Sequence, residues 1–175
     1  NECILPFIKF RSKEFQKALD RFRSMTIYET KGALEFSTGY KEFSYDFGLG
    51  GIHGCIHAGI YKSTKTHVIK TCDVTSLYPS ISIKHKFYPE HLTEEFVPIY
   101  EAVFLRRNDA KKKSKIDKAD KISKAINEGL KLALNGSYGK SNDKYSFFYD
   151  PRFTMQITVN GQLMLAMLAE RLADA

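Results

Sequence analysis

An acid followed by a turn is the first candidate for chemistry. Asp73 ends a strand-like stretch, His67–Asp73, and Ser76 and Pro79 belong to a turn directly after it. A carboxylate delivered at the end of a strand can bind a metal ion or simply form the turn. The residues that surround Asp73 must therefore decide between these interpretations.

A histidine–cysteine array is the second candidate. His53, Cys55 and His57 alternate along a strand-like stretch, which puts two imidazoles and a thiol on one face and supplies three zinc ligands. A fourth ligand is not evident, and Gly54 stands where the zinc motif HExxH has glutamate. A zinc-dependent hydrolase is thus an alternative, while polar side chains beside a glycine turn are the favoured interpretation.

Two glycine-rich patterns imitate nucleotide-binding loops. After Gly48, His53 replaces the last glycine of a dinucleotide-binding GxGxxG motif, and a strand-like stretch follows instead of a helix. The sequence Gly139-Lys140-Ser141 ends like a Walker loop, but Leu134 stands at its first glycine and a helix precedes it. Neither pattern fits the motif that it imitates.

Positive charge is concentrated in one segment. The chain of 175 residues has 27 Lys and Arg against 20 Asp and Glu, a net charge of +7. The segment Arg106–Lys124 contains nine basic residues and three Asp, a net of +6, and so carries nearly all of this excess. A phosphate-rich partner and a solvated lysine-rich tip both fit this pattern.

Composition excludes several classes of protein. With 43% hydrophobic and 13% aromatic residues, the chain is too apolar for a disordered protein. The longest apolar run, Leu163–Ala169, has seven residues, which is too short to cross a bilayer, so no membrane partner is expected. Three cysteines without CxxC spacing favour a reducing interior over a disulfide framework.

Hydrophobic periodicity predicts an α+β fold. Ser12 precedes a short helix whose apolar stripe includes Phe15 and Phe22, and the residues from Phe43 to Phe47 alternate as in a half-buried strand. Further helices are predicted at Thr93–Lys113, at Asp117–Asn135 and after a cap at Asn160, with a strand-like stretch at Tyr145–Tyr149.

The two middle helices are predicted to form an antiparallel hairpin, because a polar lysine-rich stretch joins them. In the first helix, Arg107 and Lys111 continue the apolar stripe of Phe96 and Tyr100. In the second helix, the inward stripe is predicted at Ala119, Ile122, Ile126, Leu130 and Ala133. A different side of that helix carries Lys124, Lys131, Asn135 and Tyr138.

Two segments resemble motifs of family B DNA polymerases. Asp73–Ile81 (DVTSLYPSI) resembles motif A, DxxSLYPSI, and Lys131–Gly139 (KLALNGSYG) resembles motif B, KxxxNSxYG, in the expected order. Between them, Arg107 and Lys111 have the RxxxK spacing of the basic fingers helix of that family. The resemblance covers about residues 48–172, and within the family the sequence is most similar to bacteriophage members. This similarity implies that the protein is located in the cytoplasm of a host cell.

The resemblance implies a role for each matched residue. Asp73 and the Val74 carbonyl would bind Mg²⁺, of which the complete enzyme uses two ions for phosphoryl transfer. The catalytic residues would be Asp73, Lys131 and Arg107. The nucleotide would contact Ser76, Leu77, Tyr78, Arg107, Lys111, Lys131 and Asn135, and the Tyr78 ring would exclude a 2′-hydroxyl. Primer–template DNA would contact Gly50, Gly51, Tyr138 and Gly139, although Gly48 replaces the tyrosine of the family's Tyr-x-Gly-Gly sequence.

The same resemblance implies a domain order. Residues 1–47 would lead into the palm, 48–92 would form the palm part with motif A, 93–139 the fingers hairpin with motif B, and 140–175 the return to the palm. The fold would be α+β, an antiparallel palm sheet with packed helices and an inserted two-helix fingers hairpin. Motif C, the exonuclease motifs and the thumb do not occur in this sequence.

The chain therefore reads as a fragment of a polymerase that adds deoxynucleotides to a primer 3′-hydroxyl. Its expected partners are primer–template DNA, deoxynucleoside triphosphates and the rest of the polymerase chain, and no polymerisation is expected from the isolated fragment. The alternative is a non-catalytic nucleic-acid-binding remnant of a polymerase, which the missing motif C carboxylate favours and the intact Asp73 opposes.

Overall fold

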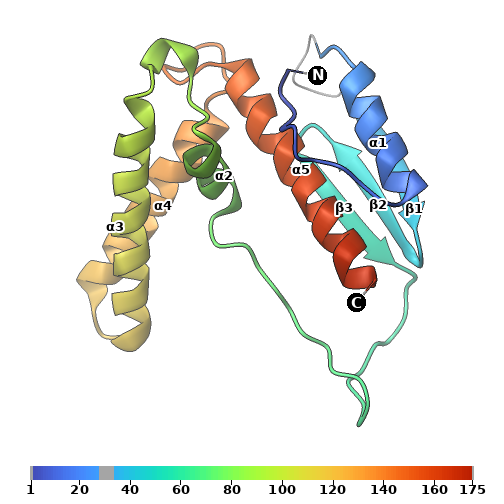
Figure 1. Cartoon of the computed structure of the whole chain (residues 1–175). Coiled ribbons are helices and arrows are strands. Elements are labelled where there is room, and N and C mark those ends of the chain that lie inside the picture. Colours follow the sequence, from blue (N-terminus) through green and yellow to red (C-terminus); the bar gives the residue numbers. More distant parts are fainter. Residues whose placement is uncertain (1, 28–33, 175) are drawn as a thin grey trace. The chain divides into compact units, whose positions relative to one another are not determined.

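The computed structural model describes residues 2–27 and 34–174, which fall into two compact units (Figure 1). The first unit comprises Asn1–Ser76 and Gln162–Ala175, and the second comprises Leu77–Gly161. The described residues have an α+β fold with one three-stranded antiparallel sheet and five α-helices, as predicted at this coarse level. In chain order the elements are α1 (Lys13–Ser24), β1 (Glu35–Tyr40), β2 (Phe43–Gly48), β3 (Gly51–Ile56), α2 (Leu77–His85), the 3₁₀ turn η1 (Glu90–Leu92), α3 (Phe96–Ile116), α4 (Lys121–Gly139) and α5 (Pro151–Ala173).

The core of the first unit lies between α1 and the sheet. The strands pair in the order β1-β2-β3, and the alternating residues of β2 bury Phe47 on one face. The Phe15 ring of α1 lies 5.0 Å from the ring of Tyr45, and the Phe22 ring lies 5.7 Å from that of Phe47. The predicted stripe of α1 and the alternation of β2 are therefore confirmed.

The start of α1 is held by a carboxylate of α5. Ser12 is the N-cap residue, yet its side chain does not cap its own helix. Its hydroxyl donates to Glu170 Oε1 at 2.6 Å, and the backbone N–H groups of Ser12 and Arg11 donate to the same carboxylate at 2.8 and 3.1 Å. Burial of Glu170 raises its pKa, but these hydrogen bonds outweigh burial, so the net pKa is below its usual value.

Replacing this carboxylate is expected to destabilise the chain. Glu170→Gln removes the charge that strengthens these hydrogen bonds, and we expect the free energy of unfolding at pH 7 to fall by about 1–3 kcal/mol. Because the folded-state pKa of Glu170 is lowered, its ionised carboxylate stabilises the fold at pH values above its usual pKa. This stabilisation is lost as the pH falls through the folded-state pKa. Urea unfolding at pH 7 and at lower pH measures both effects.

The control for this prediction is Glu14→Gln, which removes an exposed carboxylate from the first turn of α1. It is expected to change the stability by less than about 0.5 kcal/mol. A Glu170→Gln variant that is as stable as the unchanged protein at pH 7 would contradict the assignment.

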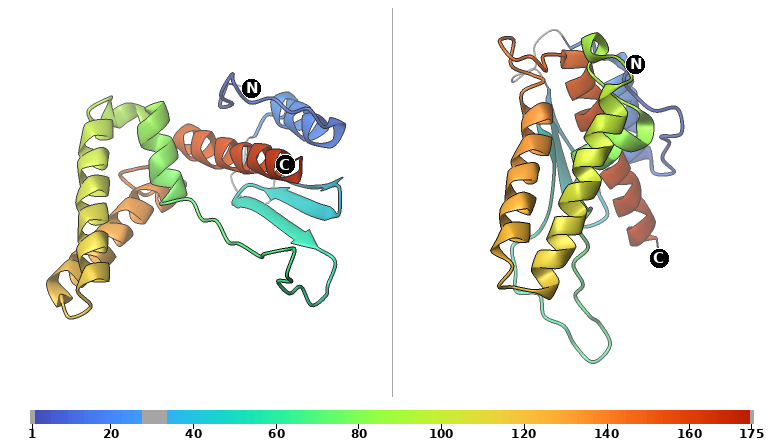
Figure 2. Two further views of the ribbon diagram at one scale, coloured as in Figure 1. Left: turned by 60° about the horizontal axis from the view of Figure 1, so that its bottom comes forward. Right: turned by 90° about the vertical axis from the view of Figure 1, so that its left-hand side faces the viewer.

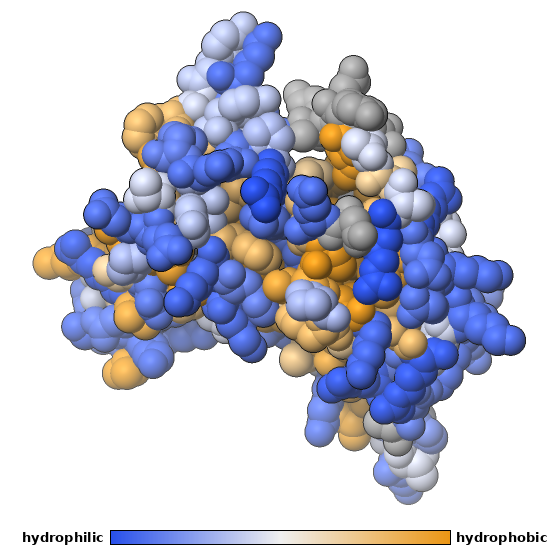
Figure 3. Space-filling model, turned by 45° about the horizontal axis from the view of Figure 1, so that its top comes forward, coloured by the Kyte–Doolittle hydropathy of each residue, from blue (hydrophilic) through white to orange (hydrophobic). Residues whose placement is uncertain are grey.

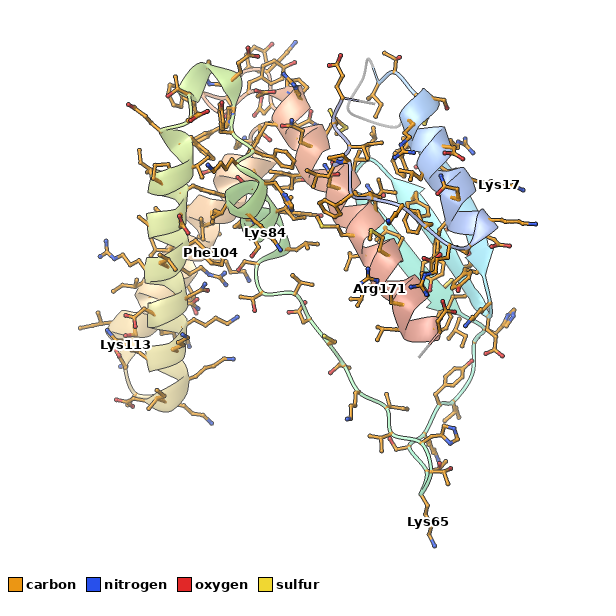
Figure 4. The ribbon with its side chains drawn as sticks, viewed as in Figure 1. Lys17, Lys65, Lys84, Phe104, Lys113 and Arg171 are labelled. Carbon is orange, nitrogen blue, oxygen red and sulfur yellow. The ribbon has the colours of Figure 1, made fainter. Side chains whose placement is uncertain are left out.

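The predicted strand His67–Asp73 is wrong. Residues 57–75 form neither helix nor strand and are exposed, and Lys65 lies at the tip of this extended segment (Figure 4). The Thr64 N–H donates to the His67 carbonyl and the Ile69 N–H donates to Ser63 Oγ, so local turns use these backbone groups. The pattern of the sequence suits a strand, but a strand also needs a neighbour, and among the described residues β1, β2 and β3 pair only with one another.

The core of the second unit is the antiparallel hairpin of α3 and α4, which run side by side in both views of Figure 2. The hairpin was predicted, and each helix lies three or four residues further along the chain than expected. The inward face of α4 was placed only partly correctly. Ile126 and Leu130 of the predicted stripe are half-buried, but Ile122 is 74% exposed, whereas Leu134 and Ser123 are buried. The inward face is rotated around the helix toward Leu134, because Tyr100 of α3 contacts α4 at that residue.

The segment before α5 also differs from its prediction. Tyr145–Tyr149 is a series of turns rather than a strand, because Asp143 and Ser146 side chains accept hydrogen bonds from the N–H groups two residues ahead. The last helix begins at Pro151, not after Asn160. Asp150 supplies its cap, since Oδ1 accepts from the Phe153 N–H at 3.0 Å. Asn160 is fully buried within α5.

Hydrophilic residues cover much of the face drawn in Figure 3, with separate hydrophobic areas between them. None of the helices in the described part of the chain combines the length and the hydrophobicity that crossing a membrane requires.

Candidate functional site

The segment that resembles motif A, Asp73–Ile81, contains a strained turn followed by a helix start. Ser76 has a φ of 50°, a left-handed conformation that costs a serine about 1–2 kcal/mol, and α2 begins at the next residue, Leu77. Strained residues of this kind cluster at functional sites. The first N–H groups of a helix point out of its end, where they favour an anion. The local conformation is therefore the one that phosphate binding at this turn would need.

Two residues of the segments that resemble motif A and motif B meet within the second unit. The ring of Tyr78 in α2 and the ring of Tyr138 near the end of α4 lie 4.4 Å apart between centroids, at an angle of 38°. Burial raises the pKa of Tyr138, and the neighbouring Tyr78 raises it further. The helix α4 continues through Gly136, the position where the family has serine, and so carries Tyr138 and Gly139 on its last turn.

A glycine of α5 allows α2 to approach closely. A Cβ atom on Gly161 would lie 3.2 Å from Ile81 Cδ1 and 4.0 Å from Tyr78 Cε1. A larger residue at Gly161 would therefore push against the helix that carries Tyr78. Sequence analysis did not select Gly161, and its only signal is a glycine inside a stretch that is otherwise suited to a helix.

The four polar residues predicted for the hairpin divide into two pairs. Arg107 and Lys111 lie on the same side of α3 as Tyr100; Arg107 is 8% exposed and Lys111 is half-buried, as their stripe predicted. Lys131 and Asn135 of α4 are exposed. Arg107 and Lys111 are thus held by the hairpin, and Lys131 and Asn135 are accessible from solvent.

A buried hydrogen bond fixes the register between these helices. The Tyr100 hydroxyl donates to the Leu134 carbonyl at 2.8 Å, and burial raises the pKa of Tyr100. This contact sets the height of α3 against α4. It therefore also sets the levels at which the cations of the two helices lie.

Removing the Tyr100 hydroxyl is expected to loosen the hairpin. Tyr100→Phe leaves the buried Leu134 carbonyl without its donor, and we expect the free energy of unfolding to fall by about 1–2 kcal/mol at pH 7. Because the folded-state pKa of Tyr100 is raised, the neutral hydroxyl stabilises the fold below pH 10, and this stabilisation is lost as the pH rises above 10. Tyr100→Phe lacks the hydroxyl, so its stability should fall less steeply in this alkaline range. Tyr145→Phe, at a residue that is 87% exposed, is the control, and an equal loss in both variants would contradict the account.

The residues predicted to hold metal belong to the first unit. Asp73 and Val74 lie in the exposed segment before α2. Within residues 2–27 and 34–174, no three His, Cys, Asp or Glu side chains are grouped so that they could hold a metal ion. Asp73 and the Val74 carbonyl therefore fit as single ligands of a hard cation and do not by themselves make a two-ion site. His53 and Cys55 are exposed on β3, and the zinc alternative gains no site from the described residues.

Of the predicted DNA-contacting glycines, Gly50 lies in the turn between β2 and β3, and Gly51 is the first residue of β3. Gly51 has a φ of 155°, and Gln162 of α5 holds the turn by donating from Nε2 to the Gly48 carbonyl at 2.8 Å. The adjoining surface hollow, about 640 Å³ in volume, is also lined by the acids Glu35 and Asp46. Negative charge beside the turn opposes a DNA phosphate, so this is the weakest part of the predicted DNA-contacting surface.

No family model, curated protein or solved structure matches this chain.

Proposed function

We propose that this chain is the palm-and-fingers part of a template-directed DNA polymerase, which adds deoxynucleotides to a primer 3′-hydroxyl. The observation that carries the proposal is the contact between Tyr78 and Tyr138. One residue comes from the segment that resembles motif A and the other from the segment that resembles motif B. A shared nucleotide site requires these two segments to lie next to each other. Two chance sequence matches would carry no such requirement.

In this proposal, the start of α2 and three cations of the hairpin would bind the phosphates of a nucleoside triphosphate. The helix start at Leu77 favours the β- and γ-phosphates, and Arg107, Lys111 and Lys131 supply positive charge from the hairpin. Tyr78 would lie against the sugar, where its ring would exclude a 2′-hydroxyl. Asn135 and Tyr138 would contact the base-pair side of the nucleotide.

Mg²⁺ would bind to Asp73 and the Val74 carbonyl, and it would polarise the phosphates of the nucleotide. The described residues group no further carboxylates with these ligands. We therefore assign to this chain the binding and orientation of the nucleotide, and we expect no polymerisation from the chain alone.

The affinity for a deoxynucleoside triphosphate tests the proposal. We expect calorimetric titration of the 175-residue chain with dATP and Mg²⁺ to show binding, and Lys131→Gln to weaken it about tenfold by removing a cation from the phosphates. Tyr78→Ala is expected to bring the affinities for ATP and dATP closer together, because the ring no longer meets the 2′-hydroxyl.

The matched control is Lys121→Gln, which removes an exposed lysine from the same helix outside the motif. It should leave the dATP affinity unchanged within about twofold. The proposal fails if the unchanged chain does not bind dATP, or if the two lysine variants weaken binding equally.

A non-catalytic nucleic-acid-binding remnant is the second candidate. It is favoured by the exposure of Asp73 outside any metal-binding group of the described residues. This candidate predicts binding to DNA without Mg²⁺-dependent binding of dATP, so the same titration separates the two.

A further inference from the structure

We propose that a lysine-lined hollow at the tip of the α3–α4 hairpin binds linked phosphate groups. The hollow has a volume of about 420 Å³, and it lies at the end of α3 that Figure 4 marks with Lys113. Its lining residues are Lys111, Ser114, Lys115, Lys118, Lys124, Asn127 and Glu128. Lys115 and Lys118 belong to the basic segment Arg106–Lys124, and no motif includes them.

Among the described residues, none of the four lysines of the hollow forms an ion pair with an acid. The ion pairs in the described part of the chain join Lys41 to Asp174, Lys113 to Asp109 and Lys140 to Asp143, and none includes a lysine that lines the hollow. The four ammonium groups therefore repel one another unless an anion lies between them.

The acids of the tip are already engaged in local structure. Asp109 accepts from Lys113 at 2.9 Å, Asp117 Oδ1 accepts from the Ala119 N–H at 2.8 Å, and Asp120 Oδ1 accepts from the Ser123 N–H at 2.9 Å. Hydrogen bonding to Ser123 lowers the pKa of Asp120, which is the cap of α4. Of the residues that line the hollow, Glu128 is the only acid, so the net charge around it remains positive.

An amide side chain in the same wall has an unused hydrogen-bonding atom. Asn127 Oδ1 is buried and has no hydrogen-bond partner within the described ranges. Asn127 also lines the hollow, and its amide group can donate an N–H to a phosphate oxygen. Buried polar groups are normally paired, so this side chain is not yet fully hydrogen-bonded.

The lining also indicates which part of a ligand binds. None of the residues around the hollow is aromatic, so the hollow offers no stacking surface for a base. Lysine ammonium groups bind phosphates as point charges, and four of them from two helices suit an anion with two or three linked phosphates. Such phosphates occur in polyphosphates and along a nucleic-acid strand, and the experiment separates these sources.

Titration with inorganic tripolyphosphate tests the site. We expect binding that weakens as the salt concentration rises, and the double variant Lys115→Gln/Lys124→Gln, one substitution in each helix, is expected to weaken it about tenfold or more. Glu128→Gln is expected to strengthen binding, because it removes the carboxylate that opposes the anion.

The matched control is Lys112→Gln/Lys121→Gln. It removes two exposed lysines from the same two helices, and neither residue lines the hollow. Far-UV circular dichroism and the melting temperature verify that each variant folds. Equal weakening by both double variants would show that only the diffuse surface charge binds, and absence of binding to the unchanged chain would also overturn the proposal.

A second titration identifies the source of the phosphates. If an octathymidylate strand displaces tripolyphosphate, and does so less well from the Lys115→Gln/Lys124→Gln variant than from the control, the hollow takes the backbone of a strand. If the strand does not compete, the hollow takes free polyphosphates. Lys111 belongs to both proposed sites. The substitutions at Lys115 and Lys124 lie outside the nucleotide site and Lys131→Gln lies outside the hollow, so the two proposals can fail separately.

Discussion

The register of α3 against α4 decides which cations of the hairpin share a surface. It is fixed by the buried hydrogen bond from Tyr100 to the Leu134 carbonyl. With the helices at this height, Arg107 is enclosed within the second unit and Lys111 faces the first turns of α4. Both proposals depend on this register, because each draws positive charge from both helices.

The sequence correctly predicted those helices and strands whose apolar side chains pack against another described element. Phe15 and Phe47 follow the helical and strand periods of α1 and β2, and both are buried as expected. His67–Asp73 has the pattern of a strand but pairs with none of the described strands, and hydrogen-bond partners cannot be read from periodicity. Asn160 is of a residue type that often caps a helix. In the structure Asp150 is the cap of α5, because its side chain accepts from the N–H of Phe153, and the helix therefore begins earlier.

Much of the candidate site required information beyond local pattern. The stripe of α3 predicted that Arg107 lies on the inward side, and the structure agrees. Nothing in hydrophobic periodicity predicts that Tyr78 meets Tyr138, since the two belong to different helices. Lys115 looks like any solvated lysine until α4 is placed beside it, because a hollow is a property of two helices rather than of one.

The central claim is that motif A and motif B form one nucleotide site, and amide chemical shifts test it most directly. We would titrate the ¹⁵N-labelled chain with dATP and Mg²⁺ and follow Leu77, Tyr78, Lys131 and Tyr138. The account predicts that the amides of both motifs shift along one binding curve with a single dissociation constant. Shifts confined to one motif, or separate curves for the two motifs, would contradict it.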